Sequence, residues 1–240
     1  MPETAPSEVE LLGNSVSYSV RQSEEAAEPR IDVDIRGVSV VLPEGSAEDP
    51  ESLLEENAAW VLEKKREFDA YREQVPERRF EEGESFPYLN DPHEVIVENR
   101  PTSVVEDRAF RLAAHHVEQT SIKRALETLY RRKARETFEA RADKYAKEVG
   151  LEYEEIEVRN QRTKWGSCST AGTLGLNWRL MMAPLPIIDY IVIHELAHLR
   201  EPNHTENFWQ LVENLDPHFK EHQTWLREQS TRLIFSDDDL

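Results

Sequence analysis

A short run in the last quarter of the chain carries the residue types of a hydrolytic metal site. His194 and His198 are four positions apart, and Glu195 directly follows the first of them. Four residues make about one helical turn, so on a helix both imidazoles lie on one face and can bind one metal ion. Glu195 would lie beside that face, where a carboxylate can take a proton from metal-bound water. The pattern predicts metal-assisted hydrolysis, with a pair of buried, hydrogen-bonded histidines as the alternative.

A third ligand is available six residues after His198. Pro202 is expected to end the first helix, and Asn203 with Glu206 has the pattern of an N-cap pair that opens the next one. Such a turn can direct His204 back toward the other two histidines. Three protein ligands with one open position are typical of catalytic zinc sites, whereas structural sites are closed by four. We therefore expect one Zn²⁺ ion, although imidazole also accepts other divalent metals.

Other histidine patterns do not have this context. His218, Glu221 and His222 fit the inverted H-x-x-E-H pattern, but no apolar helix is expected around them, so we interpret them as surface residues. The spacing of the three expected ligands equals that of metzincins. However, Glu201 stands where metzincins have glycine, and no Met-turn follows. The site is therefore not assigned to the metzincins.

Fewer signals point to residues that bind a substrate. Residues 173–177 are expected to form a strand whose edge could pair with an extended peptide, with ordinary sheet packing as the alternative. Asn177 and Arg159 are the candidate substrate-binding residues, and no oxyanion donor is assigned. Cys168 is either a fourth metal ligand that would silence the site or a small buried residue at a strand turn.

The apolar periodicity indicates the elements that must position these residues. Residues 185–200 are apolar on nearly all sides, which predicts a buried helix in which unpartnered polar groups would be costly. Apolar residues at three- and four-residue steps predict a long helix over 117–149, ended by Gly150. Strands are expected near 16–20, 31–35, 38–42, 93–98, 156–158 and 173–178, and further helices over 51–74, 205–215 and 217–233.

Composition narrows the class of protein. The chain has 240 residues, a net charge of −19 and one cysteine. No run approaches the ~20 apolar residues of a membrane-spanning helix, and the first residues lack the order of a signal peptide. One cysteine excludes a disulfide scaffold and a multi-cysteine zinc site. We therefore expect a cytoplasmic protein without a membrane partner.

The charge is distributed unevenly along the chain. Residues 1–106 carry 10 basic and 26 acidic side chains, whereas residues 120–147 carry 9 basic and 4 acidic ones. We interpret the acidity as solvated surface, with an acidic interaction face as the alternative. The basic stretch either balances the acidic first half or binds nucleic acid.

The ordered motifs around the histidines resemble a known family. They are similar to the YgjP-like metallopeptidases, a family related to the SprT-like proteins, over about residues 159–227. The resemblance implies a zincin-like fold, a zinc ion held by His194, His198 and His204, and Glu195 as the catalytic residue. The motifs that carry it are Trp165-Gly166-Ser167-Cys168, Leu176-Asn177, the stretch 189–199, Asn203-His204 and Phe208-Trp209.

These observations lead us to expect an α+β protein with a zincin-like metallopeptidase domain over 113–235. An N-terminal β-rich region with one helix, over 14–112, would pack on it, after a disordered tail over 1–13. The expected activity is hydrolysis of peptide bonds in a protein or peptide substrate, by metal-activated water with Glu195 as general base. The alternatives are a nucleic-acid-associated SprT-like protease and a non-catalytic, metal-stabilised binding module.

Overall fold

The computed structural model describes residues 6–23, 26–34, 37–161 and 164–239, and the chain divides into two compact units between Pro76 and Glu77. Each unit has its own hydrophobic core. Separate sheets and helices confirm the α+β class expected from the sequence. Among the described residues, no helix is both long and apolar enough to cross a membrane.

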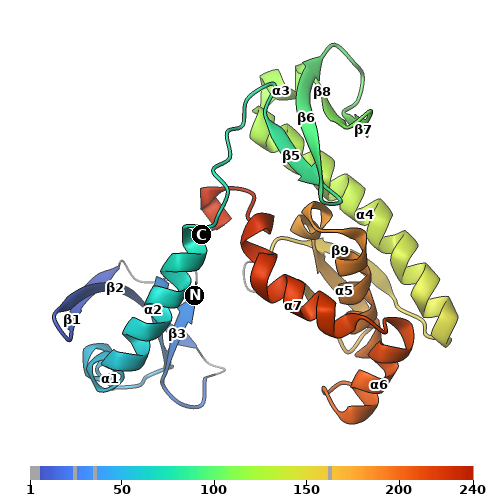
Figure 1. Ribbon diagram of the computed structural model, residues 1–240. Helices are drawn as coiled ribbons and strands as arrows, with labels where there is room; N and C mark the ends of the chain where they lie inside the picture. Colours follow the sequence, from blue (N-terminus) through green and yellow to red (C-terminus); the bar gives the residue numbers. More distant parts are fainter. Residues whose placement is uncertain (1–5, 24–25, 35–36, 162–163, 240) are drawn as a thin grey trace. The chain divides into compact units, whose positions relative to one another are not determined.

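The first unit is a four-stranded sheet packed with two helices (Figure 1). The strand order is β1-β2-β4-β3, and the β2–β4 pair is parallel. Leu54, Val61 and Leu62 of the helices pack on the inward-facing aliphatic residues of the strands. The elements are β1 (Ser7–Leu11), β2 (Asn14–Ser23), β3 (Arg30–Asp34), β4 (Gly37–Pro43), α1 (Pro50–Glu56) and α2 (Ala58–Arg72).

Strand β1 shows that the expectation of a disordered tail over residues 1–13 is wrong from Ser7 onward. Val9 and Leu11 are 7% and 1% exposed and belong to the core, and β1 pairs antiparallel with β2. Leu12 and Gly13 have positive φ angles and make the turn between the two strands. A five-residue strand whose outer face is acidic carries too little periodicity to be recognised. Residues 1–5 lie outside the described residues.

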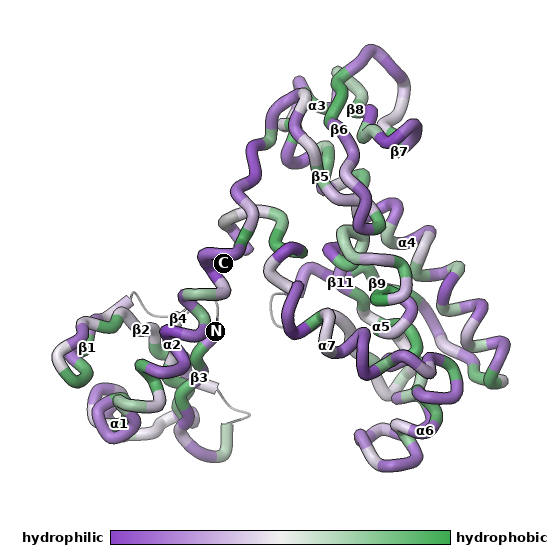
Figure 2. The backbone as a smooth tube through the Cα atoms, in the orientation of Figure 1, coloured by the Kyte–Doolittle hydropathy of each residue, from purple (hydrophilic) through white to green (hydrophobic). Residues whose placement is uncertain are grey.

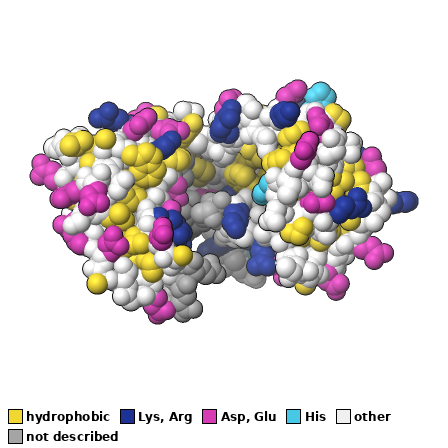
Figure 3. Space-filling view, turned by 90° about the horizontal axis from the view of Figure 1, so that it is seen from below, with side chains coloured by type: hydrophobic (Ala, Val, Ile, Leu, Met, Phe, Trp, Pro, Cys, Tyr) yellow, Lys and Arg dark blue, Asp and Glu magenta, His cyan; other side chains and the backbone are white. Residues whose placement is uncertain are grey.

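Acidic side chains are scattered over the visible face of the first unit. In Figure 3 they lie among hydrophobic and uncharged atoms, on the left of the view, rather than in one continuous patch. This distribution agrees with the interpretation of the acidity as solvated surface.

The second unit begins with a four-stranded sheet that packs against the long helix α4. Phe86 and Phe110 of this sheet belong to the same core as Leu126 and Tyr130 of the helix. The expected domain boundary at residue 112 is therefore wrong, because these strands bury their apolar faces against α4 and form a sheet of their own. The elements are β5 (Ser85–Tyr88), β6 (Asp91–Glu98), β7 (Val104–Glu106), β8 (Ala109–Ala113), α3 (Ala114–Gln119) and α4 (Ile122–Val149).

The long helix has the end signals that the sequence indicates. The Ser121 side chain accepts a hydrogen bond from the Arg124 N–H at 3.2 Å, which caps the first turn of α4. Gly150 follows the last turn with φ +65°, the left-handed conformation that ends many helices. The helix expected over 117–149 is thus confirmed from Ile122 onward, with a separate short helix before it.

The rest of the second unit combines a three-stranded sheet with the helices that follow it. Helix α5 packs against both α4 and strands β10 and β11 of this sheet, and it is mostly hydrophobic in Figure 2. The strand order is β10-β11-β9, so β11 is hydrogen-bonded on both sides and the peptide-binding edge expected at 173–177 is wrong. The elements are β9 (Glu155–Arg159), β10 (Gly166–Cys168), β11 (Thr173–Asn177), η1 (Trp178–Met182), α5 (Leu185–Ala197), α6 (Glu206–Leu215), α7 (Phe219–Gln229), η2 (Ser230–Leu233) and η3 (Asp237–Asp239).

Candidate active site

Helix α5 presents two histidines from a buried position. It is apolar on nearly all sides, so it is buried as a whole, and His194 lies in its last turn while His198 is its C-cap. The helix is fixed to α4 by a forked ion pair, in which Nε and Nη2 of Arg141 each lie 2.5 Å from a carboxylate oxygen of Asp189. The backbone that carries the histidines is therefore held from two sides, by packing and by this pair.

The third histidine meets the other two. One nitrogen from each of His194, His198 and His204 lies within 4.8 Å of the others, and this is the group of possible metal ligands found among the described residues. The Nε2 atoms of His194 and His204 are 3.1 Å apart. Two nitrogens bound tetrahedrally to one zinc ion at about 2.0–2.1 Å would be roughly 3.3 Å apart. The donor set and its spacing therefore fit a single zinc-sized ion.

The turn that brings His204 back differs in detail from the expectation. Thr205, rather than Asn203, is the N-cap of α6, and its hydroxyl accepts a hydrogen bond from the Phe208 N–H. Thr205 is the cap because it directly precedes the first helical residue, the position from which a side chain can accept a hydrogen bond from the first turn. Phe208 is fully buried, and its ring centroid lies 4.7–4.9 Å from those of all three histidines. The three imidazole rings therefore pack around the Phe208 ring.

The electrostatics at His194 and His198 favour the neutral imidazole, the form that can bind a cation. Burial, followed by the neighbouring His198 and His204, lowers the pKa of His194 to about 4. The pKa of His198 is lowered too, mainly by burial. The Nδ1 of His198 lies 3.2 Å from the Glu201 carbonyl oxygen, which leaves its other nitrogen free to accept. The Nδ1 of His194 is buried without a hydrogen-bond partner among the described residues.

Glu195 lies beside the histidines as a nearly buried carboxyl group. It is 5% exposed, and burial raises its pKa to about 7, against a smaller lowering effect of Lys164. Gly166 of strand β10 lies directly against it, because a Cβ at that glycine would be 2.3 Å from the Glu195 Oε1. The absence of a side chain at Gly166 is therefore what gives the carboxyl group its position.

A pocket of about 520 Å³ opens beside His194 and Glu195. Its lining is mixed, with Lys164 and Arg227 as cationic groups and Glu195 as the one carboxylate among its described residues. Such a pocket can accept a side chain or a polar group next to the reacting bond. The other lining residues are Trp165, Gly166, Tyr190, Ile191, Gln223 and Leu226.

The two candidate substrate-binding residues lie elsewhere. Asn177 is 3% exposed, and its amide nitrogen donates to the carbonyl oxygens of Gln161 at 2.7 Å and Lys164 at 3.3 Å. It therefore holds the chain that precedes β10. Arg159 is half-exposed on the outer strand β9 and forms an ion pair with Glu157. Neither side chain lines the pocket at Glu195.

Cys168 and the inverted histidine motif do not join the metal cluster. The Cys168 thiol is half-buried, and its pKa is raised by burial and then by Glu195. It is not part of the ligand group found among the described residues. His218 is exposed beside Glu221, as expected of a surface residue, whereas His222 is partly buried and bonded to Asp216 at 2.7 Å.

The roles of Gly166, Lys164 and Phe208 were not predicted from the sequence. Gly166 and Phe208 belong to motifs that carry the family resemblance, but their contacts with Glu195 and the histidines join distant parts of the chain. No spacing rule along one helix or strand reports such contacts. The glycine within Trp165-Gly166-Ser167-Cys168 was the available signal, because a glycine in a strand often marks a close approach of another group.

The chain matches the model of one protein family over most of its length. The model of the family described as YgjP-like, metallopeptidase domain, matches residues 27–229. UTP pyrophosphatase of Escherichia coli (strain K12) is 45% identical over 51 residues, which are 21% of this chain and 28% of that protein, so the match spans little more than a quarter of the relative.

Two solved structures are also similar to part of the chain. The metallopeptidase zymogen of Pyrococcus abyssi abylysin is 24% identical, with a TM-score of 0.36 over 39% of this chain and 95% of that one. The zymogen of Methanocaldococcus jannaschii jannalysin is 21% identical, with a TM-score of 0.36 over 39% and 96%. Because the family model covers most of the chain, including the three histidines and Glu195, this protein belongs to the YgjP-like metallopeptidase family.

Proposed function

We propose that this protein is a zinc-dependent peptidase that hydrolyses peptide bonds with metal-activated water. The observation that carries the proposal is the meeting of three imidazoles next to one buried carboxyl group, Glu195. Membership of the metallopeptidase family supports it. His194, His198 and His204 would hold the ion, and no fourth protein ligand lies in their group among the described residues.

The chemistry divides between the ion and the chain. Held by His194, His198 and His204, zinc would supply a bound water of pKa about 7 and a positive charge for the scissile carbonyl group. Glu195 has a pKa of about 7, close to neutral pH, so it can take a proton from the attacking water and return it to the leaving amine. Gly166 fixes the place from which that proton is transferred.

The substrate is best accommodated along β10. This strand is an outer strand of its sheet, and its first residue touches Glu195. An extended peptide that adds to this edge would pass the carboxyl group and could place one side chain in the pocket at Lys164. The proposal replaces β11 with β10 as the peptide-binding strand.

Cleavage profiling of a proteome-derived peptide library tests the proposal. The zinc-loaded protein is expected to cut peptides, and Glu195→Gln is expected to retain zinc and lose cleavage. Glu213→Gln, at an exposed position on α6, is the matched control and should cut normally. Equal cleavage by wild type and Glu195→Gln, or none by the wild type, would refute the peptidase assignment.

A second candidate is hydrolysis of a nucleoside triphosphate. It is favoured by the partial identity to UTP pyrophosphatase and by Lys164 and Arg227 in the pocket, since two cations suit a phosphate chain. Release of pyrophosphate from UTP, measured on the same preparations, separates the two functions. UTP turnover that Glu195→Gln abolishes, without peptide cleavage, would establish the second candidate in place of the first.

The nucleic-acid alternative finds less support. Within α4 most of the basic side chains are paired with carboxylates, so the charge of the helix is balanced locally. Filter binding to single- and double-stranded DNA at low and high salt would test it. The paired residues are Lys123, Arg124, Arg131, Lys133, Arg135 and Arg141.

A non-catalytic, metal-stabilised module makes a different prediction. Chelation would unfold it, and Glu195 would be dispensable.

The cytoplasmic location expected from the sequence stays a prediction.

A further inference from the structure

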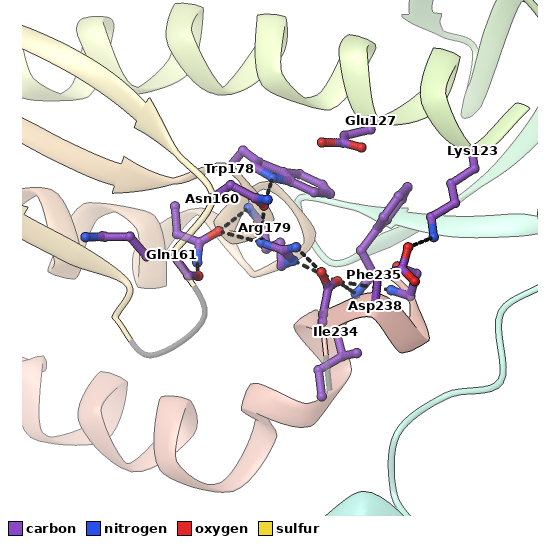
Figure 4. A network of polar contacts seen from close by, with 12 residues as sticks. Lys123, Glu127, Asn160, Gln161, Trp178, Arg179, Ile234, Phe235 and Asp238 are labelled. Atoms are coloured by element: carbon purple, nitrogen blue, oxygen red, sulfur yellow. Dashed lines mark hydrogen bonds and ion pairs between the residues drawn. The ribbon is translucent and has the colours of Figure 1, made fainter. Parts of the chain in front are cut away.

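A buried ion pair joins the segment Phe235–Asp239 to η1, the short helix that directly follows β11. Arg179 is 6% exposed, and its Nε donates to Asp239 Oδ2 at 2.9 Å, with a second contact from Nη2 to Oδ1. The same Oδ2 accepts the backbone N–H groups of Phe235 and Ser236 at 3.0 and 3.1 Å. Figure 4 shows this network around Arg179. A charge pair this buried persists only when its other donors and acceptors are also satisfied.

The far side of Arg179 reaches the chain before β10. Its Nη1 donates to Asn160 Oδ1 at 2.7 Å, and that oxygen also accepts the Trp178 indole N–H at 2.9 Å. The Asn177 side-chain oxygen accepts the Arg179 backbone N–H at 3.1 Å. The guanidinium group thus contacts both asparagines, because Nη1 donates to Asn160 Oδ1 (Figure 4) and also lies 3.4 Å from Asn177 Oδ1.

Asn177 connects this network to residues 164–166, which line one side of the active site. Its side chain holds the carbonyl oxygens of Gln161 and Lys164, and its backbone N–H donates to the Trp165 carbonyl at 2.9 Å. The next residue, Gly166, lies against Glu195. The contacts from Asp239 to Glu195 are therefore continuous, and each of them joins described groups of the second unit.

Apolar packing and polar contacts have separate tasks in this segment. Phe235 is 2% exposed, and its ring centroid lies 4.9 Å from that of Trp178 and 5.0 Å from that of Phe80. This burial docks the segment by itself. The Asp239 carboxylate fixes the orientation of the Arg179 side chain, because a two-point contact forms with only one orientation of the guanidinium group.

We propose that Asp239, Arg179 and Asn160 are positioning residues that hold Lys164, Trp165 and Gly166 in place beside Glu195. The proposal rests on the proposed hydrolytic function of that site. Without these hydrogen bonds, the segment Phe235–Asp239 stays bound through Phe235, but residues 164–166 are no longer held in place. Glu195 then loses its fixed position. A purely structural role would instead weaken the whole second unit.

Hydrogen exchange of the zinc-loaded protein tests the proposal without any substrate. Asp239→Asn is expected to speed exchange at least about tenfold at the amides of 164–168 and of Asn177, while amides of α5 keep their protection. Asp238→Asn is the matched control, because its carboxylate pairs with Lys123 and is 79% exposed. Exchange in Asp239→Asn that matches the control, or that rises throughout residues 77–239, would overturn the proposal.

A second pair of variants guards against misfolding of Asp239→Asn. Asn160 is exposed as a residue, so Asn160→Ala is expected to fold, yet it loses the oxygen shared by Arg179 and Trp178. Asn160→Asp keeps an acceptor there. Faster exchange at 164–168 in Asn160→Ala and its restoration in Asn160→Asp are expected, and equal exchange in both variants would contradict the proposal.

Kinetics give the second readout. On a peptide that the wild type cleaves, Asp239→Asn is expected to lower kcat at least about tenfold at unchanged zinc content. An unchanged kcat would count against the positioning role. If the wild type cleaves no peptide, the peptidase function fails, but the exchange experiment still decides the positioning role.

Discussion

Replacing Gly166 with alanine puts a methyl group where the Glu195 carboxyl group now lies. The new Cβ would be 2.3 Å from Oε1, 2.7 Å from Cγ and 2.8 Å from Cδ of Glu195, whereas ordinary van der Waals contacts lie at 3.4–4 Å. Relief of all three contacts requires the carboxyl group to move by about 1 Å. A misplacement of that size can cost about 100-fold in rate, or roughly 2.7 kcal/mol in the activation barrier.

The assay measures zinc content and kcat/KM together. We expect Gly166→Ala to bind zinc as the wild type does, because the histidines do not touch Gly166 in the described contacts, and to lose about 100-fold in kcat/KM. Gly175→Ala on the adjacent strand is the matched control, since its nearest contacts are with Ser167 and Arg159 rather than Glu195. Wild-type turnover by Gly166→Ala at full zinc content would show that Gly166 does not set the position of the Glu195 carboxyl group.

Three further predictions follow from the site. His204→Ala should leave zinc below one equivalent by elemental analysis, because two imidazoles remain, whereas His218→Ala at an exposed position should stay fully loaded. In chelator-treated protein, Glu195→Gln should gain stability over the wild type as pH rises from 4.5 to 7, by up to about 3 kcal/mol in urea titrations. The sign follows because burial raises the folded pKa of Glu195, so its stabilising contribution is present below pH 4.5 and is lost toward pH 7; an equal difference at pH 5 and pH 8 would contradict it. Arg141→Met should cost about 2–3 kcal/mol by removing one partner of the partly buried pair with Asp189, and a change below 0.5 kcal/mol would show that α5 does not depend on it.

The metal cluster could be predicted from the sequence because its geometry is mostly local. His194 and His198 lie four residues apart at the end of a single helix. That helix ends at Ala197, earlier than the end expected from Pro202, and His204 follows after a short turn. Even there, the N-cap of the next helix is Thr205 instead of the expected Asn203, since both polar residues are plausible caps.

Contacts between elements could not be predicted in the same way. The match of Gly166 to Glu195 depends on how β10 packs on α5, and the central place of β11 depends on strand order. Neither is encoded by periodicity along one strand, which reports faces but not neighbours.

The domain boundary expected at residue 112 was wrong for a related reason. The sequence places residues 77–113 with the β-rich first half, because three strands are expected before them and a fourth at 93–98. Their partner is helix α4, which comes later in the chain. A segment of short strands can be assigned to a unit only when the surface that buries it is known.

X-ray absorption at the zinc edge of the loaded protein tests whether three histidines hold one zinc ion. We expect imidazole scattering from three histidines and one further oxygen ligand from solvent, all at about 2.0–2.2 Å. A sulfur ligand at about 2.3 Å, which Cys168 would supply, or scattering from fewer than three imidazoles would contradict it.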